Sequence, residues 1–332
     1  MKRIVIREFG APSVMKIEDV EIGNPGPGEI KVRNYAIGVN YTDVYFRSGN
    51  DTYLADAKQK INTFTPGKEG AGIVLEVGED VNNFKLGDRV VYTQSLGAYG
   101  EEHIVKESLT MHLPDGLSFE LAASNTLRGL TSYFLCHYTY PIKKGDIAIV
   151  HACTGGVGSL LTQWIKNMGG IVIGTIHTEG KRELAHKIGA DFVINTATED
   201  IVAKVDEFTN GDKAHVVFDG VGKAVAKASL DSLRSFGYYV NFGMVTGPVV
   251  FNLWELANHG KNNGSRYATF GDLEHHVADY DRLQTMAEDW FKALLDGSIK
   301  IETPLQLPLA EAPKAQELLE SNKHTGTVIL IP

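Results

Sequence analysis

The stretch from Asp146 to Gly170 constrains the fold of this chain more than any other part of it. The run Ile147–His151 is apolar and β-prone, a glycine-rich turn follows it as far as Gly158, and a helical pattern then continues to Met168. A buried strand, a glycine turn and a helix in this order open a dinucleotide-binding βαβ unit. Gly155 would let the backbone approach a diphosphate, and Gly158 would let the helix pack closely on the strand.

The turn departs from the full fingerprint in one place, because Cys153 stands where the first glycine of G-x-G-x-x-G is usual. Two interpretations are therefore open: a dinucleotide site, or a glycine-rich connection between strand and helix that binds nothing. The position of the turn between a clear strand and a clear helix favours the dinucleotide site.

Downstream of this turn, strands and helices alternate, as is typical of a doubly wound parallel sheet. The strands are expected as short apolar runs, and the helices by apolar residues at helical spacing. The sequence predicts strands at Ile171–Ile176, Phe192–Ile194, Val216–Phe218 and Tyr238–Val240, with helices at 156–168 and 183–188.

The chain before Ser118 is instead rich in short β-prone runs that glycine and proline separate. The runs include Glu29–Asn34 and Ala36–Val39. This pattern predicts a strand-and-turn domain in the form of a partly closed β-barrel. Toward the C-terminus we expect helices over 280–295 and 313–320 and a closing strand over 327–331, all of which could rejoin the first domain.

The end of the second strand of the βαβ unit indicates which nicotinamide cofactor would bind. NAD sites place a carboxylate there to hold the ribose hydroxyls, whereas this strand end has no acid before Glu179. Lys181 and Arg182 follow, and cations without a competing carboxylate favour the 2′-phosphate of NADPH. We therefore expect NADPH, although the same two cations would also fit as solvated residues at a helix start.

Composition excludes several classes of function. The 332 residues carry 32 basic and 41 acidic side chains, a formal net charge of −9, without any block of Lys and Arg, so we expect no nucleic-acid partner and no membrane surface. No apolar run approaches the roughly 20 residues of a membrane helix. The two cysteines, Cys136 and Cys153, cannot build a disulfide framework, and the first residues lack the features of a signal peptide, so we expect a cytoplasmic protein.

Motifs spread over nearly the whole chain together indicate a family. They are Gly38-Val39-Asn40-Tyr41-Thr42-Asp43, Pro66-Gly67-Lys68-Glu69-Gly70, Gly129-Leu130-Thr131, Gly155-Gly156-Val157-Gly158, Phe218-Asp219-Gly220-Val221-Gly222 and Asn241-Phe242-Gly243. In order and spacing they resemble the quinone oxidoreductase (zeta-crystallin-like), zinc-free branch of the medium-chain dehydrogenase/reductase superfamily. The resemblance implies a GroES-like catalytic domain at residues 1–122 and 265–332, an inserted Rossmann NADPH-binding domain at 123–264, and a homodimer.

The resemblance also bears on metal binding. Zinc alcohol dehydrogenases of this superfamily have Cys where this chain has Asn40 and His where it has Lys68, and neither replacement ligates zinc. Their structural-zinc lobe needs four clustered cysteines, and this chain has two that lie far apart. We therefore expect no metal site and a reaction that needs none.

Without zinc, the expected reaction is one that NADPH performs with little help. Hydride transfer to a quinone or to the β-carbon of an enone qualifies, because conjugation delocalises the incoming charge. By the resemblance, Asn40, Asp43 and Tyr45 lie where nicotinamide and acceptor meet, and Tyr53 and Lys68 are further catalytic candidates. Each has a structural alternative: packing for the two tyrosines, a loop brace for Asp43, and a solvated or salt-bridged cation for Lys68, which could also pair with Glu69.

The resemblance assigns the remaining site residues to the cofactor. Asn40 would contact the nicotinamide, Phe242 and Gly243 would close its far side, and Lys323 is a candidate for phosphate or nicotinamide contacts. Where relatives often carry a Tyr near the adenosine end, this chain has Thr196. The residues expected around ribose, diphosphate and adenosine phosphate are Thr131, Gly155, Gly156, Val157, Gly158, Gly174, Thr178 and Lys181.

Three functions stay open at this point. The first is an NADPH:quinone oxidoreductase, the second an NADPH-dependent enone or alkenal double-bond reductase that uses the same site, and the third a protein that binds NADPH with little turnover. The presence of Asn40, Asp43 and Tyr45 favours an enzyme, since a non-catalytic chain would be expected to lose its pocket residues before its cofactor turn.

Overall fold

The computed structural model describes residues 1–49, 63–257, 264–321 and 326–332. By their internal contacts the parts of the chain form two compact units. Unit 1 comprises Met1–Leu127, Glu274–Leu295 and Ile301–Pro332, and unit 2 comprises Arg128–Leu273 and Asp296–Lys300. Unit 1 therefore draws on both ends of the chain. The functional division predicted at 1–122, 123–264 and 265–332 stays a prediction.

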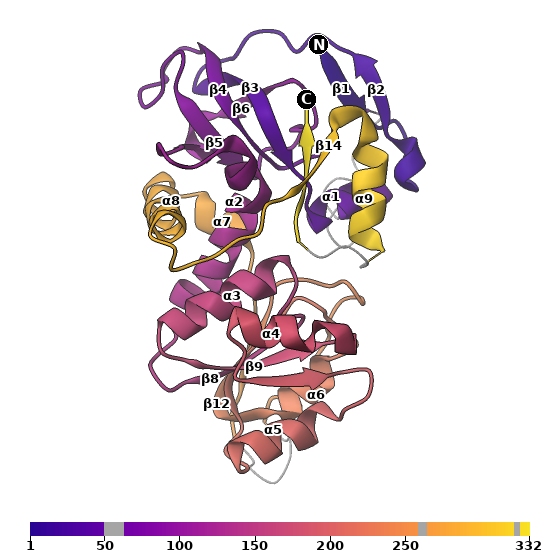
Figure 1. The fold of residues 1–332 in the computed structure, drawn as a ribbon, viewed down its shortest axis with the longest axis vertical. Coiled ribbons are helices and arrows are strands. Elements are labelled where there is room, and N and C mark those ends of the chain that lie inside the picture. Colours follow the sequence, from indigo (N-terminus) through magenta and orange to yellow (C-terminus); the bar gives the residue numbers. More distant parts are fainter. Residues whose placement is uncertain (50–62, 258–263, 322–325) are drawn as a thin grey trace. The chain divides into compact units, whose positions relative to one another are not determined.

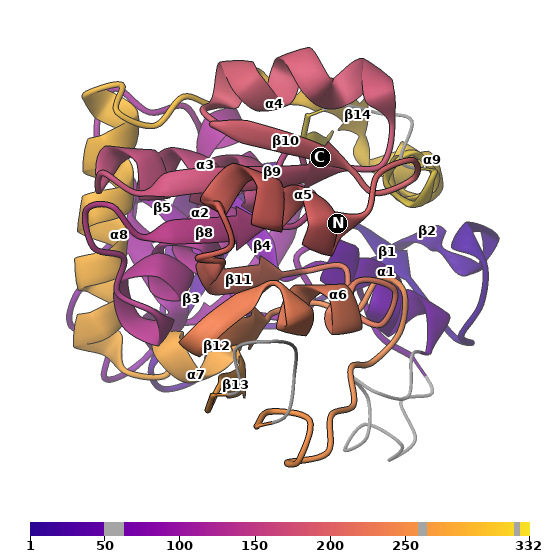
Figure 2. The ribbon, with the colours of Figure 1, turned by 90° about the horizontal axis from the view of Figure 1, so that it is seen from below.

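Unit 2 is built on a six-stranded parallel sheet. Its strands are β8 (Ile147–Val150), β9 (Ile171–Ile176), β10 (Phe192–Asn195), β11 (Ala214–Asp219), β12 (Leu233–Asn241) and β13 (Tyr267–Phe270). They lie in the order β10-β9-β8-β11-β12-β13, which Figure 2 shows as a stack of strands. Because the order runs outward from β8 in both directions, the sheet is doubly wound, and its topological switch point lies between β8 and β11.

Helices connect these strands in two layers. The connecting helices are α3 (Gly156–Asn167), the short turn η4 (Glu179–Lys181), α4 (Arg182–Ile188), α5 (Ile201–Thr209) and α6 (Ala226–Asp231), whereas α2 (Phe119–Phe134) and the π-helical turn η3 (Leu135–Thr139) precede β8. Helices α3 and α4 contact each other over β8, β9 and β10, and α5 and α6 contact each other over β10, β11 and β12. The predicted Rossmann fold class is confirmed.

Unit 1 contains a seven-stranded sheet that includes the C-terminal strand (Figure 1). Its strands are β3 (Glu29–Gly38), β4 (Glu69–Val77), β5 (Arg89–Thr93), β6 (Glu102–Lys106), β7 (Thr110–His112), β14 (Leu305–Pro308) and β15 (Val328–Ile331), and β1 (Lys2–Val5) pairs separately with β2 (Lys16–Asp19). Antiparallel pairing of β15 with β3, which matches Ile329 with Gly38, joins the two chain ends. The remaining helices are η1 (Pro12–Val14), α1 (Tyr41–Ser48), η2 (Glu107–Leu109), α7 (Leu273–Val277), α8 (Tyr280–Leu295), η5 (Leu309–Glu311) and α9 (Ala312–Glu320).

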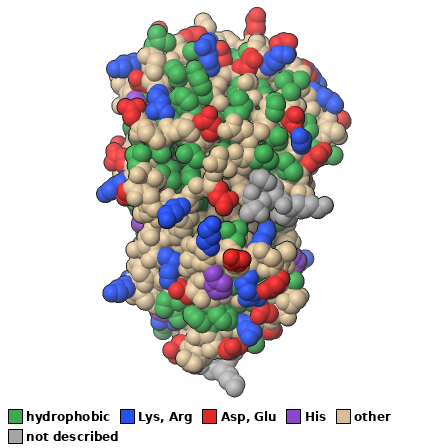
Figure 3. Space-filling view, viewed as in Figure 1, with side chains coloured by type: hydrophobic (Ala, Val, Ile, Leu, Met, Phe, Trp, Pro, Cys, Tyr) green, Lys and Arg blue, Asp and Glu red, His purple; other side chains and the backbone are tan. Residues whose placement is uncertain are grey.

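The surface carries both signs of charge side by side. On the face that Figure 3 shows, Lys and Arg side chains are interspersed with Asp and Glu side chains. Within the described ranges, none of the helices combines the length and the hydropathy that crossing a bilayer requires.

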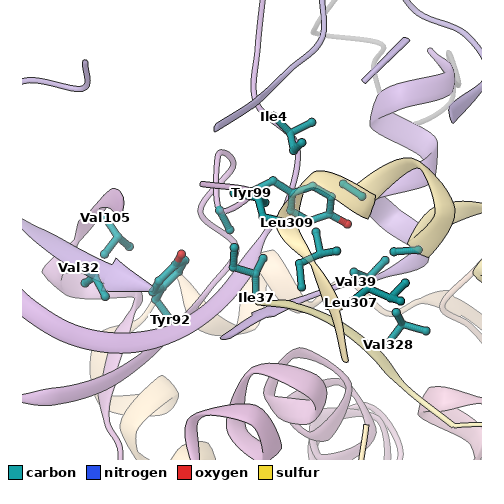
Figure 4. Close-up of a cluster of buried hydrophobic side chains, with 14 of the residues drawn as sticks. Ile4, Val32, Ile37, Val39, Tyr92, Tyr99, Val105, Leu307, Leu309 and Val328 are labelled. Atoms are coloured by element: carbon teal, nitrogen blue, oxygen red, sulfur yellow. The ribbon is translucent and has the colours of Figure 1, made fainter. Parts of the chain in front are cut away.

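The interior of unit 1 explains why the chain ends return to it. Val32 and Ile37 of β3, Tyr92 of β5 and Val105 of β6 are all at most 1% exposed, and Figure 4 shows them in one cluster with Leu307, Leu309 and Val328 from the C-terminal segment. Each large apolar side chain buried in this way contributes roughly 1.5–3 kcal/mol to folding. The C-terminal strand is therefore part of the core of unit 1.

The structure differs from the sequence prediction along β3. Two strands are predicted at Glu29–Asn34 and Ala36–Val39, whereas the structure has one strand with an irregularity between Asn34 and Ala36. The polar Asn34 interrupts the apolar pattern, but it is buried and donates from Nδ2 to the carbonyls of Ala98 and Gly100 at 3.1 and 2.9 Å. Because its hydrogen bonds are satisfied inside the fold, the strand continues through it.

Candidate functional site

The turn after β8 is held in an uncommon backbone conformation. Ala152 has a φ of +48°, which non-glycine residues seldom adopt. Its amide donates to Thr175 Oγ1 at 3.2 Å, and the amide of Cys153 donates to the Thr175 carbonyl at 3.0 Å, so that β9 anchors the turn twice. Gly155 immediately precedes α3 and has no side chain to cap it. The first amides of α3 are therefore available to a bound anion, as a diphosphate site requires.

Glycines in and beside this turn allow contacts that no side chain would permit. A Cβ on Gly158 would lie 2.4 Å from the Ala152 carbonyl oxygen, and a Cβ on Gly174 would lie 2.5 Å from the sulfur of Cys153. Cys153 thus takes the place of the usual first glycine because Gly174 leaves room for its sulfur. Burial raises the pKa of the Cys153 thiol to about 12, so the thiol stays neutral beneath the turn.

The other side of the switch point presents a second glycine turn. Asp219, the last residue of β11, accepts the amides of Val221 and Gly222 on Oδ1 at 2.7 and 2.9 Å. A Cβ on Gly243 would lie 2.7 Å from the carbonyl oxygen of Gly220, so the segment after β12 packs directly on this turn. The predicted cofactor segments therefore follow neighbouring strands at one sheet edge, and this arrangement fits a dinucleotide.

The sequence analysis missed a buried histidine, His151, that shares a hydrogen-bond partner, Thr175 Oγ1, with the turn after β8. His151 is 1% exposed, and its Nδ1 lies 3.0 Å from Thr175 Oγ1 while its Nε2 lies 2.7 Å from Ser229 Oγ. Ser229 Oγ also donates to the Val225 carbonyl at 2.7 Å. Burial lowers the pKa of His151, and a neutral ring that accepts from Thr175 and donates to Ser229 satisfies every hydroxyl in this chain of hydrogen bonds.

Helix α2 brings two further residues to unit 2. Thr131, a predicted cofactor residue, is 9% exposed, and Arg128 lies one turn earlier with 7% exposure. The side chain of Arg128 packs against Gly156, where an added Cβ would lie 2.9 Å from Arg128 Cδ. Sequence reasoning missed Arg128, although an arginine three residues before the predicted Thr131 was a usable signal. A cation beside the first residue of α3 suits a diphosphate.

The expected adenosine end of the site lies where β9 ends. The short turn η4 follows the strand. Thr178 immediately precedes this turn, and Lys181 is its last residue. His177 Nδ1 lies 3.4 Å from Thr196 Oγ1, so Thr196 joins the ends of β9 and β10. Thr178 is exposed and Lys181 is half-buried, as residues that meet a phosphate from solvent would be.

Arg182 differs from its neighbours, because it is fully engaged by the protein. Its guanidinium donates to both carboxylate oxygens of Glu179, to the Val193 carbonyl at 2.6 Å and to Glu199 Oε2 at 3.0 Å. The sequence suggests two cations for a 2′-phosphate at this place. In the structure Arg182 is bound to carboxylates and a carbonyl of the protein, and a role of Lys181 at a 2′-phosphate stays a prediction.

In unit 1, three of the predicted catalytic residues lie at the N-cap of α1 or within this helix. Asn40, at the N-cap, is 3% exposed and donates from Nδ2 to Glu69 Oε2 at 2.8 Å. Asp43, fully buried, accepts on Oδ2 from the Asn40 amide at 2.9 Å and from the Tyr99 hydroxyl at 3.0 Å. Tyr45 is 8% exposed on the same helix. The contacts of Asp43 are those of a brace that fixes Asn40.

Lys68, the fourth catalytic candidate, is held by three partners. Its ammonium donates to Gln94 Oε1 at 3.0 Å, lies 3.6 Å from Glu274 Oε2, and lies 5.0 Å from the centre of the Phe46 ring. Gln94 has a φ of +57°, so the loop that presents it is constrained as well. Lys68 therefore pairs with Glu274, while Glu69 is engaged with Asn40.

Tyr53 and Lys323 lie outside the described residues. Among the residues that the structure describes, there is no group of three or more His, Cys, Asp or Glu side chains that could hold a metal ion.

Comparison with known proteins identifies the family. The model of the alcohol dehydrogenase GroES-like domain matches residues 26–115, and that of the zinc-binding dehydrogenase matches residues 156–280. The second match does not include Asn40 or Lys68, so it says nothing about zinc ligands at those positions.

Similarity to individual proteins extends over the whole chain. Quinone oxidoreductase of Pseudomonas aeruginosa is 40% identical, over 100% of this chain and 99% of that protein. The crystal structure of Escherichia coli quinone oxidoreductase complexed with NADPH is 38% identical, covers 100% of both chains and superposes with a TM-score of 0.93. The 2-haloacrylate reductase of a Burkholderia species is 33% identical, over 99% of this chain and 98% of that protein. The chain therefore belongs to the quinone oxidoreductase family of the medium-chain dehydrogenase/reductase superfamily.

Proposed function

We propose that this protein catalyses the NADPH-dependent reduction of quinones, in which bound NADPH supplies a hydride to the conjugated acceptor. The observation that carries the proposal is the similarity over the whole chain to quinone oxidoreductases, one of which was crystallised with NADPH. The constrained glycine turn at the switch point of the sheet supports the cofactor independently.

Unit 2 would bind the cofactor. The open N-terminus of α3, with Gly155, Gly156, Val157 and Gly158, would accept the diphosphate, and Arg128 would add a positive charge beside it. Thr131 would hold the ribose, and Phe242 with Gly243 would lie against the nicotinamide. The adenosine phosphate would be surrounded by Gly174, Thr178, Lys181 and, outside the described residues, Lys323.

Unit 1 would supply the acceptor-facing groups. Asn40, fixed by Glu69 and by the brace of Asp43, would hydrogen-bond the nicotinamide or the acceptor carbonyl. The hydroxyl of Tyr45 would donate to that carbonyl, and a proton from it or from water would complete the hydroquinone after hydride arrival. Tyr53 would add a second wall to the acceptor site. Lys68, with its ammonium held by Gln94 and Glu274, would stiffen the neighbouring loop.

The reaction would need no metal. Asn40 directs its amide nitrogen to Glu69, and Lys68 presents a protonated amine that has no lone pair for a metal. Neither group is oriented or charged as a zinc ligand would be.

The proposed assembly is a homodimer that forms through β13. This strand lies at the edge of the unit 2 sheet, and within the described part of the chain it pairs only with β12. Its four residues are exposed, with Tyr267 at 44% and Phe270 at 47%, and Trp254 of the preceding loop is 74% exposed. An exposed edge strand with aromatic side chains is suited to pair with a second strand.

The dimer proposal has a direct test. Replacing Tyr267 by Lys puts a charge on the edge strand, so the mass measured by light scattering at micromolar concentration should fall from that of a dimer to that of a monomer. A mass that stays dimeric would place the interface elsewhere.

We further propose a cytoplasmic location and small-molecule partners only. Both Cys136 and Cys153 are buried free thiols, which suits a reducing compartment. The interspersed charges of Figure 3, together with the net charge of −9, suit neither a nucleic-acid surface nor an anionic membrane.

A second candidate function is NADPH-dependent reduction of an activated carbon–carbon double bond. The observation that favours it is the 2-haloacrylate reductase, which resembles this chain from end to end. The same hydride would then attack the β-carbon of the acceptor, and a proton would be added at the α-carbon.

Acceptor tests separate the two functions. Oxidation of NADPH would be followed by its absorbance with 9,10-phenanthrenequinone, with an enone, and with NADP⁺ plus an alcohol, each repeated with NADH and with a chelator. Oxidation by the quinone that is faster with NADPH and unaffected by chelator supports the first proposal, and a preference for the enone supports the second. Chelator-sensitive alcohol oxidation would overturn both, and NADPH binding without turnover by any acceptor would indicate a binding protein.

A further inference from the structure

The carboxylate of Glu179 lies in the region that decides between NAD and NADP cofactors. Glu179 follows the end of β9 by three residues and is the first acid after that strand, and its side chain is 63% exposed. At this strand end a free carboxylate accepts hydrogen bonds from the ribose hydroxyls of NAD, and it would repel the roughly two negative charges of a 2′-phosphate. A chain that prefers NADPH must therefore hold the Glu179 carboxylate away from the 2′-phosphate or offset its negative charge.

The structure shows how the carboxylate is engaged. Arg182 binds both oxygens of Glu179, and Asn195 at the end of β10 donates from Nδ2 to Glu179 Oε2 at 2.9 Å. These hydrogen bonds, first from Arg182 and then from Asn195, lower the pKa of Glu179 to about 2. Glu179 is thus ionised at neutral pH, and both of its oxygens are bound by the adjacent guanidinium.

Arg182 is in turn fixed by groups other than Glu179. Glu199 Oε2 and the Val193 carbonyl bind the remaining sides of the guanidinium, so each of its nitrogens has a partner. Lys181 differs, since none of the described residues forms an ion pair with its ammonium. A phosphate at this place would therefore meet Lys181 as the accessible cation and Arg182 as a cation already committed to carboxylates.

We propose that Arg182 sets the preference for NADPH over NADH without touching the cofactor, by holding Glu179 toward Asn195 and cancelling its charge. Arg182 is then a positioning residue for specificity, and Lys181 is the group that meets the 2′-phosphate. The inference rests on the proposed use of NADPH and adds to it the origin of the preference.

Binding measurements on four forms of the protein test this inference. Dissociation constants for NADPH and NADH would be measured by nicotinamide fluorescence for the natural protein, Arg182→Met, Glu179→Gln and the double variant. Arg182→Met should lower the preference for NADPH about tenfold, because the freed carboxylate repels the phosphate and accepts the ribose hydroxyls. The double variant should regain the preference to within about threefold, because position 179 then carries no carboxylate and Glu199 is still held by the backbone amide of Asn195 at 2.6 Å.

The double variant distinguishes the inference from direct phosphate binding. If Arg182 were a ligand of the phosphate, removing Glu179 would not restore the preference, and the double variant would stay as poor as Arg182→Met; that result overturns the inference. Lys227→Met is a matched control, since it breaks the ion pair with Asp231 on α6 and should leave the preference unchanged. Arg182→Lys, which keeps the charge, replaces Arg182→Met should the latter not fold, and it should lose less of the preference.

The same measurements distinguish failure of the proposed NADPH preference from failure of the proposed role of Arg182. A natural protein that binds NADH as well as NADPH would refute the proposed cofactor preference itself. A natural protein that prefers NADPH, with an Arg182→Met variant that prefers it equally, would refute only the role of Arg182.

Discussion

The side-chain amide of Asn40 donates to Glu69 Oε2 at 2.8 Å, and the other oxygen of the same carboxylate accepts the backbone amide of Leu127 at 2.5 Å. Glu69 is fully buried. Because both oxygens of Glu69 accept in these contacts, the nitrogen end of the Asn40 amide faces Glu69, and the carbonyl oxygen is turned the other way. Glu69 therefore selects the atom that Asn40 can offer to a cofactor or acceptor.

Replacing Glu69 by Gln should impair both stability and turnover. A glutamine has one acceptor oxygen, so it can satisfy either Asn40 or Leu127 but not both, and a buried donor left without an acceptor costs roughly 1–3 kcal/mol. We expect a lower midpoint of thermal unfolding and a kcat with phenanthrenequinone that falls about tenfold as the Asn40 amide loses its fixed orientation. Glu79→Gln, an exposed change after the same strand, is the control; equal kcat in the two variants would contradict the role of Glu69.

Replacing Lys68 by Met should have little effect on catalysis. The ion pair with Glu274 joins a Lys side chain that is 13% exposed to a carboxylate that is 67% exposed, and such pairs contribute at most about 1 kcal/mol. We expect unfolding in urea to shift slightly and kcat with phenanthrenequinone to stay within about threefold of that of the natural protein. A loss of a hundredfold, with a changed pH profile of kcat, would instead show that Lys68 polarises the acceptor.

Two glycines of the cofactor turn should respond differently to alanine. At Gly158 the added Cβ would lie 2.4 Å from a backbone oxygen, so Gly158→Ala should lower the stability of unit 2 as well as NADPH affinity. At Gly155 the nearest atom would be the same oxygen at 3.1 Å, a contact that small shifts relieve, so Gly155→Ala should fold normally and lose affinity for NADPH by more than tenfold. Calorimetric unfolding and NADPH titration separate the two; normal affinity in Gly155→Ala would argue against diphosphate binding at this turn.

The parts of the fold that local sequence determines could be predicted, and the parts that depend on distant contacts could not. The strand, glycine turn and helix around Gly155 follow from residues adjacent in the chain, and they are present as predicted. The roles of His151 and Arg182 depend on partners up to 78 residues away, which no local pattern contains. Lys181 and Arg182 look alike in sequence, and only the carboxylates around Arg182 distinguish them.

Both ends of helix α1 are marked by local sequence signals, although no helix is predicted there. Asn40 at the N-cap, Asp43 three residues later and Gly49 with a φ of +72° at the end mark both helix termini. The sequence analysis interprets Asn40 and Asp43 as parts of a family motif and as candidate site residues, with a loop brace as the alternative for Asp43. The motif and the helix caps coincide because the groups that position Asn40 are also those that start the helix.

Acid should destabilise this protein through His103. His103 is 4% exposed, its Nε2 lies 2.8 Å from Ser95 Oγ, and burial, with a smaller effect of Arg3, lowers its pKa from 6.5 to about 3. The unfolded chain therefore binds a proton at this residue between about pH 6.5 and 3 that the folded chain does not, so stability falls as the pH decreases through this range. One such proton changes the free energy of unfolding by up to roughly 1.4 kcal/mol per pH unit.

We expect the urea midpoint of the natural protein to drop more between pH 7.5 and 5 than that of His103→Gln, which cannot be protonated but can still accept from Ser95. His275→Gln, an exposed change on α7, should behave like the natural protein, and an equal drop in all three would show that His103 is not the residue responsible.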